Sequence, residues 1–460
     1  MARVFWFRRD LRLQDNVALN QAINSAIAEG DARVAPVYAL NIQDFKALEG
    51  IRQWSLVESL RSLQASLGGN LSVLQGEQAQ SLVGAALKVG ATVVHATRAF
   101  DTVGIAEQNA VGLALRDAGV FLQLDDSYYA VSPGSVIKPD GSPYRVYTPF
   151  FKNWFQLGWA QPVALAEGAK WLSFAENTGL PEPTKTSPIP VRAGEKFAER
   201  TFERFKLRAL NNYDEARNRA DLSGTSHLSH ALAFGEIHPR TILADLQESP
   251  GHDVFRKEIA WREFYADVLF HNQHTNRDYY EPRFAKMRYD QGPEAEAKFT
   301  AWKLGKTGYP MVDAGMRQLL TTGWMHNRVR MIVASFLIKD LHLEWQLGAE
   351  WFEQNLSDFD PASNAHGWQW TAGCGTDASP YYRVFNPVLQ GYKFDPRGDY
   401  VRKYVPELAH IYGPDVHEPW LRLDGLNHGY PARIVDHGTE RDESLARLKE
   451  IKQTPEDLQR

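Results

Sequence analysis

The chain has 460 residues, 43% of them apolar, a length and composition typical of a globular protein with two or more domains. Its formal net charge of -5 excludes a uniformly basic nucleic-acid coat, although a local basic groove is compatible with it. The single cysteine, Cys374, excludes an intramolecular disulfide and a multi-cysteine metal site, and we expect no metal.

Neither a signal peptide nor a membrane span is predicted. The first residues, MARVFWFRRDLR, enter a strand-like run without the apolar stretch of a signal peptide. No apolar run reaches the roughly 18 residues that suggest a transmembrane helix. We therefore expect a cytoplasmic protein in a reducing compartment.

Residues 1–130 are predicted to form an α/β domain. Short apolar runs alternate with helical stretches such as SLVESLRSLQASL, which is typical of a parallel, Rossmann-like sheet with crossover helices. The predicted strands cover residues 4–7, 34–40, 71–75, 92–97 and 120–126. Because they are almost continuously apolar, we expect helices on both faces of the sheet.

The rest of the chain has a different character. Residues 131–200 are rich in Pro, Gly and Ser, which predicts a connector between domains. Residues 201–460 show helical periodicity with little strand signal, so the C-terminal domain is expected to be all-α.

Residues 253–270, DVFRKEIAWREFYADVLF, are predicted to form an amphipathic helix. Glu258, Trp261, Arg262 and Tyr265 fall at i, i+3, i+4 and i+7 and share one face. Such polar and aromatic groups make a poor hydrophobic seam. Two interpretations remain: a ligand-binding face, or a partly buried helix held by ion pairs.

A second helix is predicted over residues 322–340, with Trp324, Asn327, Arg328 and Met331 near one face. An amide and a thioether beside an indole suit a planar ligand with polar edges, such as a base. The same pattern also occurs in core helices.

Residues 224–239, GTSHLSHALAFGEIHP, place Gly, Thr and Ser before an apolar-periodic helix. Hydroxyls and unpaired N–H groups at a helix start predict a diphosphate site, with a simple N-cap as the alternative. The sequence GCGTDA (373–378) imitates a dinucleotide fingerprint, but it has no preceding strand and is rejected.

These segments, with DFDPASNAHGWQW (358–370), YYRVFNPVLQGYKFDP and the N-terminal WFRRDLRLQDNVAL, together resemble the photolyase/cryptochrome family over essentially the whole chain. The similarity is to class I photolyases that repair cyclobutane pyrimidine dimers. It implies a monomer that binds no membrane and uses photoexcited, reduced FAD to transfer an electron to a dimer flipped out of damaged DNA.

The resemblance also implies roles for individual residues. Glu258 would hydrogen-bond the dimer and Asn364 would face the flavin N5, which makes both catalytic. Electrons would pass through Trp368, Trp345 and Tyr289, with Trp302 or Trp351 as alternative surface donors. Residues expected to bind FAD are Tyr213, Thr225, Ser226, His227, Leu228, Ser229, Phe255, Arg262, Arg330, Asp358, Phe359, Asp360 and Asn364. Residues expected to contact DNA are Arg217, Glu258, Trp261, Asn327, Arg328, Met331, Trp370, Arg383 and Gln390.

Three alternatives remain at this stage. A cryptochrome-like blue-light receptor is disfavoured because Asn364, Glu258 and Met331 are of the repair type and because no long tail follows YPARIVDH. A relative of the DASH type would prefer single-stranded DNA, and a generic flavin oxidoreductase lacks its nucleotide fingerprint. An antenna near residues 97–108 is undecided between methenyltetrahydrofolate and 8-hydroxy-5-deazaflavin, and the sequence assigns no role to His366.

Overall fold

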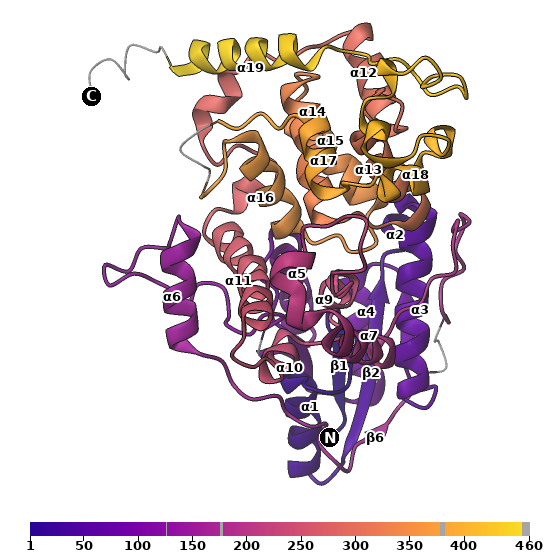
Figure 1. The fold of residues 1–460 in the computed structure, drawn as a ribbon. Coiled ribbons are helices and arrows are strands. Elements are labelled where there is room, and N and C mark those ends of the chain that lie inside the picture. The colour runs from indigo at the N-terminus through magenta and orange to yellow at the C-terminus, as the bar shows by residue number, and fades with distance from the viewer. Residues whose placement is uncertain (126, 175–177, 378–381, 453–460) are drawn as a thin grey trace. The chain divides into compact units, whose positions relative to one another are not determined.

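The computed structural model describes residues 1–125, 127–174, 178–377 and 382–452 (Figure 1). The chain divides into two compact units. The first comprises Met1–Asn211 and Ser226–Gln273, and the second comprises Asn212–Thr225 and His274–Arg460. The domain limits at residues 130 and 200 remain a prediction, because compactness alone does not define a domain that folds independently.

The first unit contains the predicted parallel sheet. Its strand order is β3-β2-β1-β4-β5, and the short β6 pairs with β2. The strands are β1 Arg3–Phe7, β2 Arg33–Leu40, β3 Ser72–Gln75, β4 Val93–Thr97, β5 Phe121–Asp125 and β6 Lys170–Trp171. The five predicted strands are confirmed to within one residue at each described end; Asp126, the last residue of the fifth, lies outside the described residues.

Helices cover both faces of this sheet. Phe5 and Phe7 of β1 belong to the core that includes α1 and α3, whereas Val4 and Trp6 belong to the core that includes α4 and α5. The helices of the first unit are α1 Val17–Ala28, α2 Ile42–Ala47, α3 Gly50–Ser66, α4 Gln78–Val89, α5 Thr102–Asp117, α6 Tyr147–Leu157, α7 Glu195–Arg208, α9 Ser229–Phe234, α10 Pro239–Ala244 and α11 Pro250–His271. The expectation of a sheet buried on both faces is therefore confirmed.

The predicted connector contains regular structure of its own, namely α6, β6 and α7; its residues 175–177 lie outside the described residues. The first residues of the connector are held by a carboxylate of α11. Glu263 accepts the N–H groups of Ala130 and Val131 at 2.5 and 3.1 Å and the indole N–H of Trp154 at 2.5 Å. Burial raises the pKa of Glu263 to about 7.

The described residues of the second unit form helices joined by loops, without a β-strand, as predicted. Its helices are α8 Tyr213–Ala216, α12 Pro293–Lys303, α13 Pro310–Thr322, α14 Asn327–Lys339, α15 Trp345–Asn355, α16 Pro361–Ala372, α17 Pro387–Phe394, α18 Asp399–Tyr404 and α19 His437–Lys452. Short 3-10 helices in the chain are η1 Leu210–Asn212, η2 Gln273–Asn276, η3 Pro282–Lys286, η4 Pro406–Leu408, η5 Gly413–His417 and η6 Pro419–Leu421. Several α-helices begin at proline, whose fixed φ and missing N–H suit a helix start.

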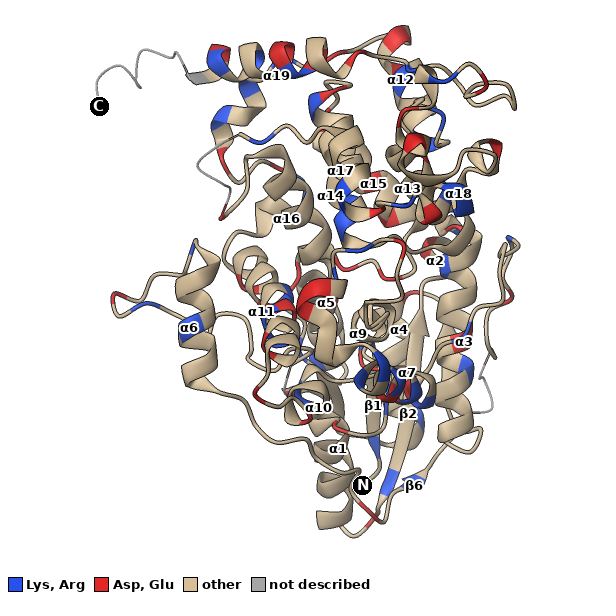
Figure 2. Cartoon of the chain, in the orientation of Figure 1, with Lys and Arg blue, Asp and Glu red and all other residues tan. Residues whose placement is uncertain are grey.

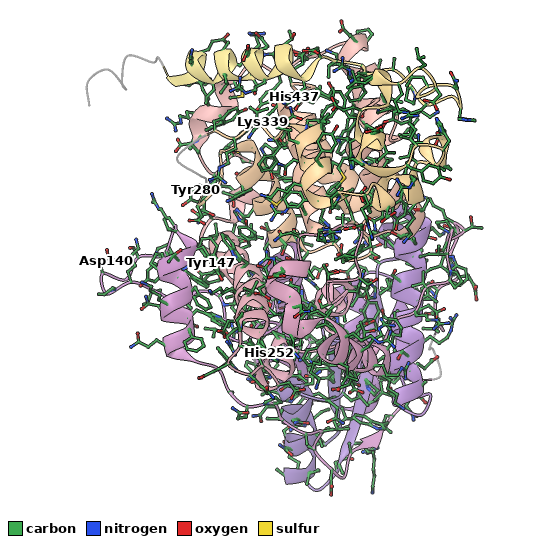
Figure 3. All side chains as sticks on the ribbon, viewed as in Figure 1. Asp140, Tyr147, His252, Tyr280, Lys339 and His437 are labelled. Atoms are coloured by element: carbon green, nitrogen blue, oxygen red, sulfur yellow. The ribbon has the colours of Figure 1, made fainter. Side chains whose placement is uncertain are left out.

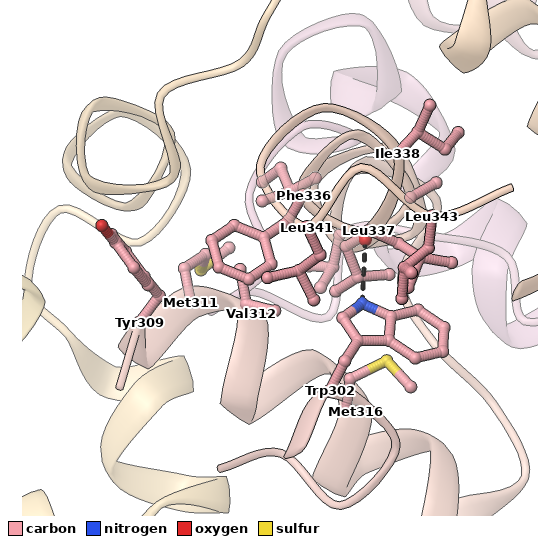
Figure 4. Close-up of a cluster of buried hydrophobic side chains, with 14 of the residues drawn as sticks. Trp302, Tyr309, Met311, Val312, Met316, Phe336, Leu337, Ile338, Leu341 and Leu343 are labelled. Carbon is pink, nitrogen blue, oxygen red and sulfur yellow. Dashed lines mark hydrogen bonds between the residues drawn. The ribbon is translucent and has the colours of Figure 1, made fainter. Parts of the chain in front are cut away.

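The core of the second unit lies between α12, α13 and α14 (Figure 4). Trp302 is completely buried there and donates its indole N–H to the Val333 carbonyl at 3.0 Å. The expectation that Trp302 is a surface tryptophan is therefore wrong. No helix in the described ranges is long and apolar enough to cross a membrane.

Gly348 allows α15 to approach α16 closely, and Gly348→Ala is expected to lower the free energy of unfolding by about 1–3 kcal/mol. A Cβ at this position would lie 2.1 Å from the Trp368 ring and 2.6 Å from Leu337. Gly367→Ala is the matched control, because nothing lies within 4 Å of its added Cβ. Urea unfolding followed by circular dichroism measures both. Equal stability of the Gly348→Ala and unmodified proteins would contradict a rigid contact.

Candidate functional site

Helix α16 in the second unit carries the two tryptophans of the segment DFDPASNAHGWQW. Asp360 caps the helix by accepting the Ser363 N–H at 2.9 Å, and Pro361 follows it. Residues two apart on a helix point to opposite sides, since each residue turns the helix by about 100°. Trp368 is buried, with its ring 5.0 Å from that of Phe352, whereas the half-buried Trp370 donates its N–H to the Asp377 carbonyl at 3.2 Å.

Asn364 links α16 to α15. Its amide nitrogen donates to the Ala349 carbonyl at 3.0 Å. One of the two amide N–H groups is therefore committed to the protein, and the amide oxygen is the atom able to accept a hydrogen bond from a ligand. This arrangement supports the predicted role of Asn364 in facing a ring N–H.

Asp358 and Arg330 form the predicted pair. Arg330 Nη2 lies 2.6 Å from Asp358 Oδ2, and Arg330 Nε donates to the Met325 carbonyl at 2.8 Å. The second oxygen of Asp358, Oδ1, is buried and has no hydrogen-bond partner among the described residues. The neighbouring Phe359 is half-buried against the core of the second unit.

Unpartnered buried atoms test whether the residues present fit a flavin. A buried polar atom without a partner costs about 1–3 kcal/mol unless a ligand or water satisfies it. In the described part of the second unit, Asp358 Oδ1, an acceptor, and the indole N–H of Trp368, a donor, are among such atoms. An isoalloxazine ring offers both N–H and carbonyl groups, so these residues fit FAD.

The helix predicted over residues 322–340 is interrupted. Helix α13 ends at Thr322 and α14 begins at Asn327, so the expectation that Trp324 shares a helix face with Asn327 is wrong. The physical reason is His326, which caps α14 by accepting the Arg328 N–H on Nδ1 at 3.1 Å. Asn327 is exposed and Met331, one turn later, is half-buried.

The residues expected to contact DNA on and near α14 and α17 differ in exposure and in their contacts with other side chains. In Figure 2, Lys and Arg mark the first part of α14. Arg328 is engaged there by Asn218 Oδ1 at 2.5 Å and by Met331 Sδ at 3.4 Å. By contrast, Arg383 is exposed, and Gln390 on α17 is half-buried. Arg217 follows α8 and lies over the Tyr213 ring at 5.7 Å.

The residues expected to carry electrons lie in the second unit. Trp345 begins α15, one turn before Gly348, and Gly348 contacts Trp368. Tyr289 is half-buried rather than exposed, and burial raises its pKa.

In the first unit, α11 presents Trp261 to a second aromatic ring. The rings of Trp261 and Tyr147 are stacked with centroids 3.7 Å apart and planes within 7° (Tyr147 is labelled in Figure 3). Glu258 is half-exposed one turn earlier. Sequence reasoning missed Tyr147, because no local sequence pattern pairs it with Trp261, which lies more than 100 residues later in the chain.

Arg262 is held by contacts within the first unit. It donates to the carbonyls of Tyr128 at 3.3 Å and Leu232 at 3.2 Å, and it lies over the Tyr129 ring. Phe255, also expected at the cofactor, is buried against Phe205 with ring centroids 4.9 Å apart.

The segment predicted to hold the diphosphate forms a short helix start. Thr225 belongs to the second unit, whereas Ser226, His227, Leu228 and Ser229 belong to the first. Leu228 caps α9 without a side-chain bond, and its N–H donates to the Ser226 hydroxyl at 3.3 Å. His227 adopts a left-handed backbone conformation with φ of 54°. Tyr213, predicted for the same ligand, is buried in the second unit.

His366, to which the sequence assigns no role, is a buried residue of α16. Its Nε2 lies 3.4 Å from the Thr275 hydroxyl, and burial lowers its pKa to about 3. The ring is therefore neutral at physiological pH, and it connects α16 to η2.

Comparisons with known proteins agree with this geometry. Residues 3–167 match the family model "DNA photolyase" and residues 255–450 match "FAD binding domain of DNA photolyase". A deoxyribodipyrimidine photo-lyase of Agrobacterium fabrum is 40% identical over 98% of each chain.

Solved structures give the same result. A bacterial class III photolyase from Agrobacterium tumefaciens has a TM-score of 0.87 and 38% identity over 98% of each chain. A Synechocystis cryptochrome has a TM-score of 0.87 and 26% identity over 97% of this chain and 98% of that one. Both family models, the full-length relative and these structures agree: the chain belongs to the DNA photolyase family and carries its FAD-binding domain.

Proposed function

We propose that this photolyase repairs cyclobutane pyrimidine dimers, with bound, reduced FAD supplying the light-driven electron transfer. The observation that supports this substrate class is that His326 caps α14. The resemblance implies that enzymes for (6-4) photoproducts need two histidines on the pocket helix, whereas this segment has one, and it is buried as the cap of α14. Asn327 and Met331 then remain to contact an uncharged lesion with polar edges.

The residues of the chain bind and orient the dimer. Tyr147 covers one face of Trp261, so a base stacks on the other face, and stacking on an aromatic ring contributes about 1–3 kcal/mol per base. Trp370 is proposed as a second stacking residue. Glu258 hydrogen-bonds the dimer carbonyls and stabilises negative charge that develops there.

A separate set of residues supplies the electrons that reduce an oxidised flavin. We propose that Trp345 re-reduces Trp368, and that a tyrosine in turn re-reduces Trp345. Asn364 presents its amide oxygen to the cofactor while α15 holds its amide nitrogen. Arg330 and Asp358 hold the cofactor ring, and Thr225 to Ser229 hold its phosphates.

The antenna stays undecided. Residues 97–108 form the end of β4 and the start of α5, where Asp101 caps the helix and Arg8 contacts Glu107 at 3.0 Å. These contacts do not distinguish a folate from a deazaflavin. Cytoplasmic location and a monomeric state likewise remain predictions.

Glu258→Ala is expected to lower the number of dimers repaired per absorbed photon several-fold while FAD remains bound. In the proposed role the neutral carboxylic acid form of Glu258 donates its O–H to the dimer, and the variant removes this donor to the developing negative charge. Glu248→Ala, which changes an exposed carboxylate just before α11, is the control. Repair of thymine-dimer oligonucleotides under blue light measures the yield. An unmodified, fully reduced protein that repairs no dimers would instead favour the receptor function.

Arg383→Ala and Trp261→Ala should separate affinity from selectivity. Arg383 is exposed, so its loss should reduce the slope of log affinity against log salt by about 0.9 on damaged and undamaged DNA alike. Trp261→Ala should lower the preference for damaged DNA. Arg441→Ala, an exposed arginine on α19, should change neither. Fluorescence anisotropy at several salt concentrations measures both quantities, and equal losses of selectivity in Arg383→Ala and Trp261→Ala would refute the division.

Trp368→Phe is expected to abolish most photoreduction of oxidised FAD, since it removes the first electron donor. Trp420→Phe is the control, because Trp420 is also a tryptophan of the second unit but contacts Arg433 and Tyr309, whereas Trp368 contacts Phe352. Loss of the flavin absorbance under blue light gives the rate. Photoreduction that survives in Trp368→Phe would place the first donor elsewhere.

A further inference from the structure

Tyr279, which precedes η3 in the second unit, links a tryptophan of the electron relay to a surface carboxylate. Its ring lies edge-on to Trp345 with centroids 6.2 Å apart. Its hydroxyl donates to Glu344 Oε1 at 3.4 Å. Tyr279 is buried and Glu344 is exposed, so the pair connects the interior to solvent.

The backbone that carries Tyr279 is fixed by α16. The side-chain amide of Gln369, which is completely buried, accepts the Tyr280 N–H at 2.7 Å and donates to the Thr275 carbonyl at 2.8 Å. The Glu281 N–H donates to the Cys374 carbonyl at 3.0 Å. Tyr280, labelled in Figure 3, marks this segment. The helix that holds Trp368 therefore also sets the position of Tyr279.

A buried phenol needs a base before it can give up an electron. Burial raises the pKa of Tyr279 to about 12, so the phenolate is not formed in advance at neutral pH. An oxidised phenol is strongly acidic, and its electron and proton must leave together. Glu344 is the carboxylate hydrogen-bonded to this phenol; Tyr289 and Gln346 also hydrogen-bond Tyr279, and Cys374 lies nearby.

We propose that Tyr279 reduces oxidised Trp345 and that Glu344 accepts the proton. One electron passes from Tyr279 to the Trp345 radical cation, the O–H bond of Tyr279 breaks, and a new O–H bond forms on Glu344. The products are neutral Trp345, a neutral tyrosyl radical and a neutral carboxylic acid, so charge and atoms balance. The inference rests on the proposed function, which makes Trp345 part of the relay.

Tyr289 has a different part in this scheme from the one the sequence suggests. The single O–H of Tyr279 is directed at Glu344, so in the hydrogen bond between the two phenols Tyr289 is the donor and the Tyr279 oxygen the acceptor. A phenol that donates to the Tyr279 oxygen stabilises that oxygen once its own proton has gone. Tyr289 is thus a positioning residue for Tyr279 rather than the first tyrosine to be oxidised.

The test uses the holoenzyme with oxidised FAD, followed by transient absorption and electron paramagnetic resonance after a flash. Tyr279→Phe should lose the tyrosyl signal and lengthen the life of the tryptophan radical several-fold, whereas Tyr289→Phe should keep a tyrosyl signal. Glu344→Gln should slow tyrosyl formation about 10²-fold, the lower range for losing a general base. Tyr280→Phe and Glu350→Gln are the matched controls and should behave as the unmodified protein.

A second readout follows the proton. Light-minus-dark infrared spectra of the unmodified protein should show the carbonyl band of a neutral carboxylic acid, and Glu344→Gln should remove it. A tyrosyl signal that persists in Tyr279→Phe, or a carboxylic-acid band that persists in Glu344→Gln, overturns the inference alone. Absence of any tryptophan radical in the unmodified protein overturns the electron path of the proposed function, and this inference with it.

Discussion

The close contact between α15 and α16 is the constraint on which the rest of the second unit depends. Gly348 lets the Trp368 ring approach the backbone of α15 at a distance that no side chain would allow. The same contact places Asn364 where its amide can donate to Ala349. Because close-packed interiors transmit small displacements, any shift of α15 would move Trp368 and Asn364 together, the proposed electron donor and the proposed cofactor ligand.

Helix α16 distributes its residues between separate tasks. Trp368 faces the core, Trp370 reaches the loop at Asp377, and Gln369 holds the segment that carries Tyr279. Three consecutive positions on a helix point in three directions, so this one element can serve the three roles proposed for it, toward cofactor, substrate and relay, without long connecting loops. The concentration of indole in DFDPASNAHGWQW follows from this geometry.

Much of this architecture could be predicted from the sequence, but the contacts between distant segments could not. The strands of the first unit follow from continuous apolar runs, which leave little choice of register. The break between α13 and α14 was not predicted, because the helical periodicity continues through His326. The His326 side chain in fact caps the first turn of α14. The stack of Trp261 on Tyr147 and the bond from Tyr279 to Glu344 join residues with no shared periodicity. Such pairs are set by packing, and only the folded chain reveals them.

The lone thiol of Cys374 has a practical consequence. It is buried, and burial raises its pKa, so almost no thiolate exists at neutral pH. Because the thiolate is the form that reacts with maleimides and with thiol-directed spin labels, the native chain is expected to react very slowly with these reagents. A cysteine introduced at an exposed position such as Arg383 would become the one labelled site, without a cysteine-free background having to be built.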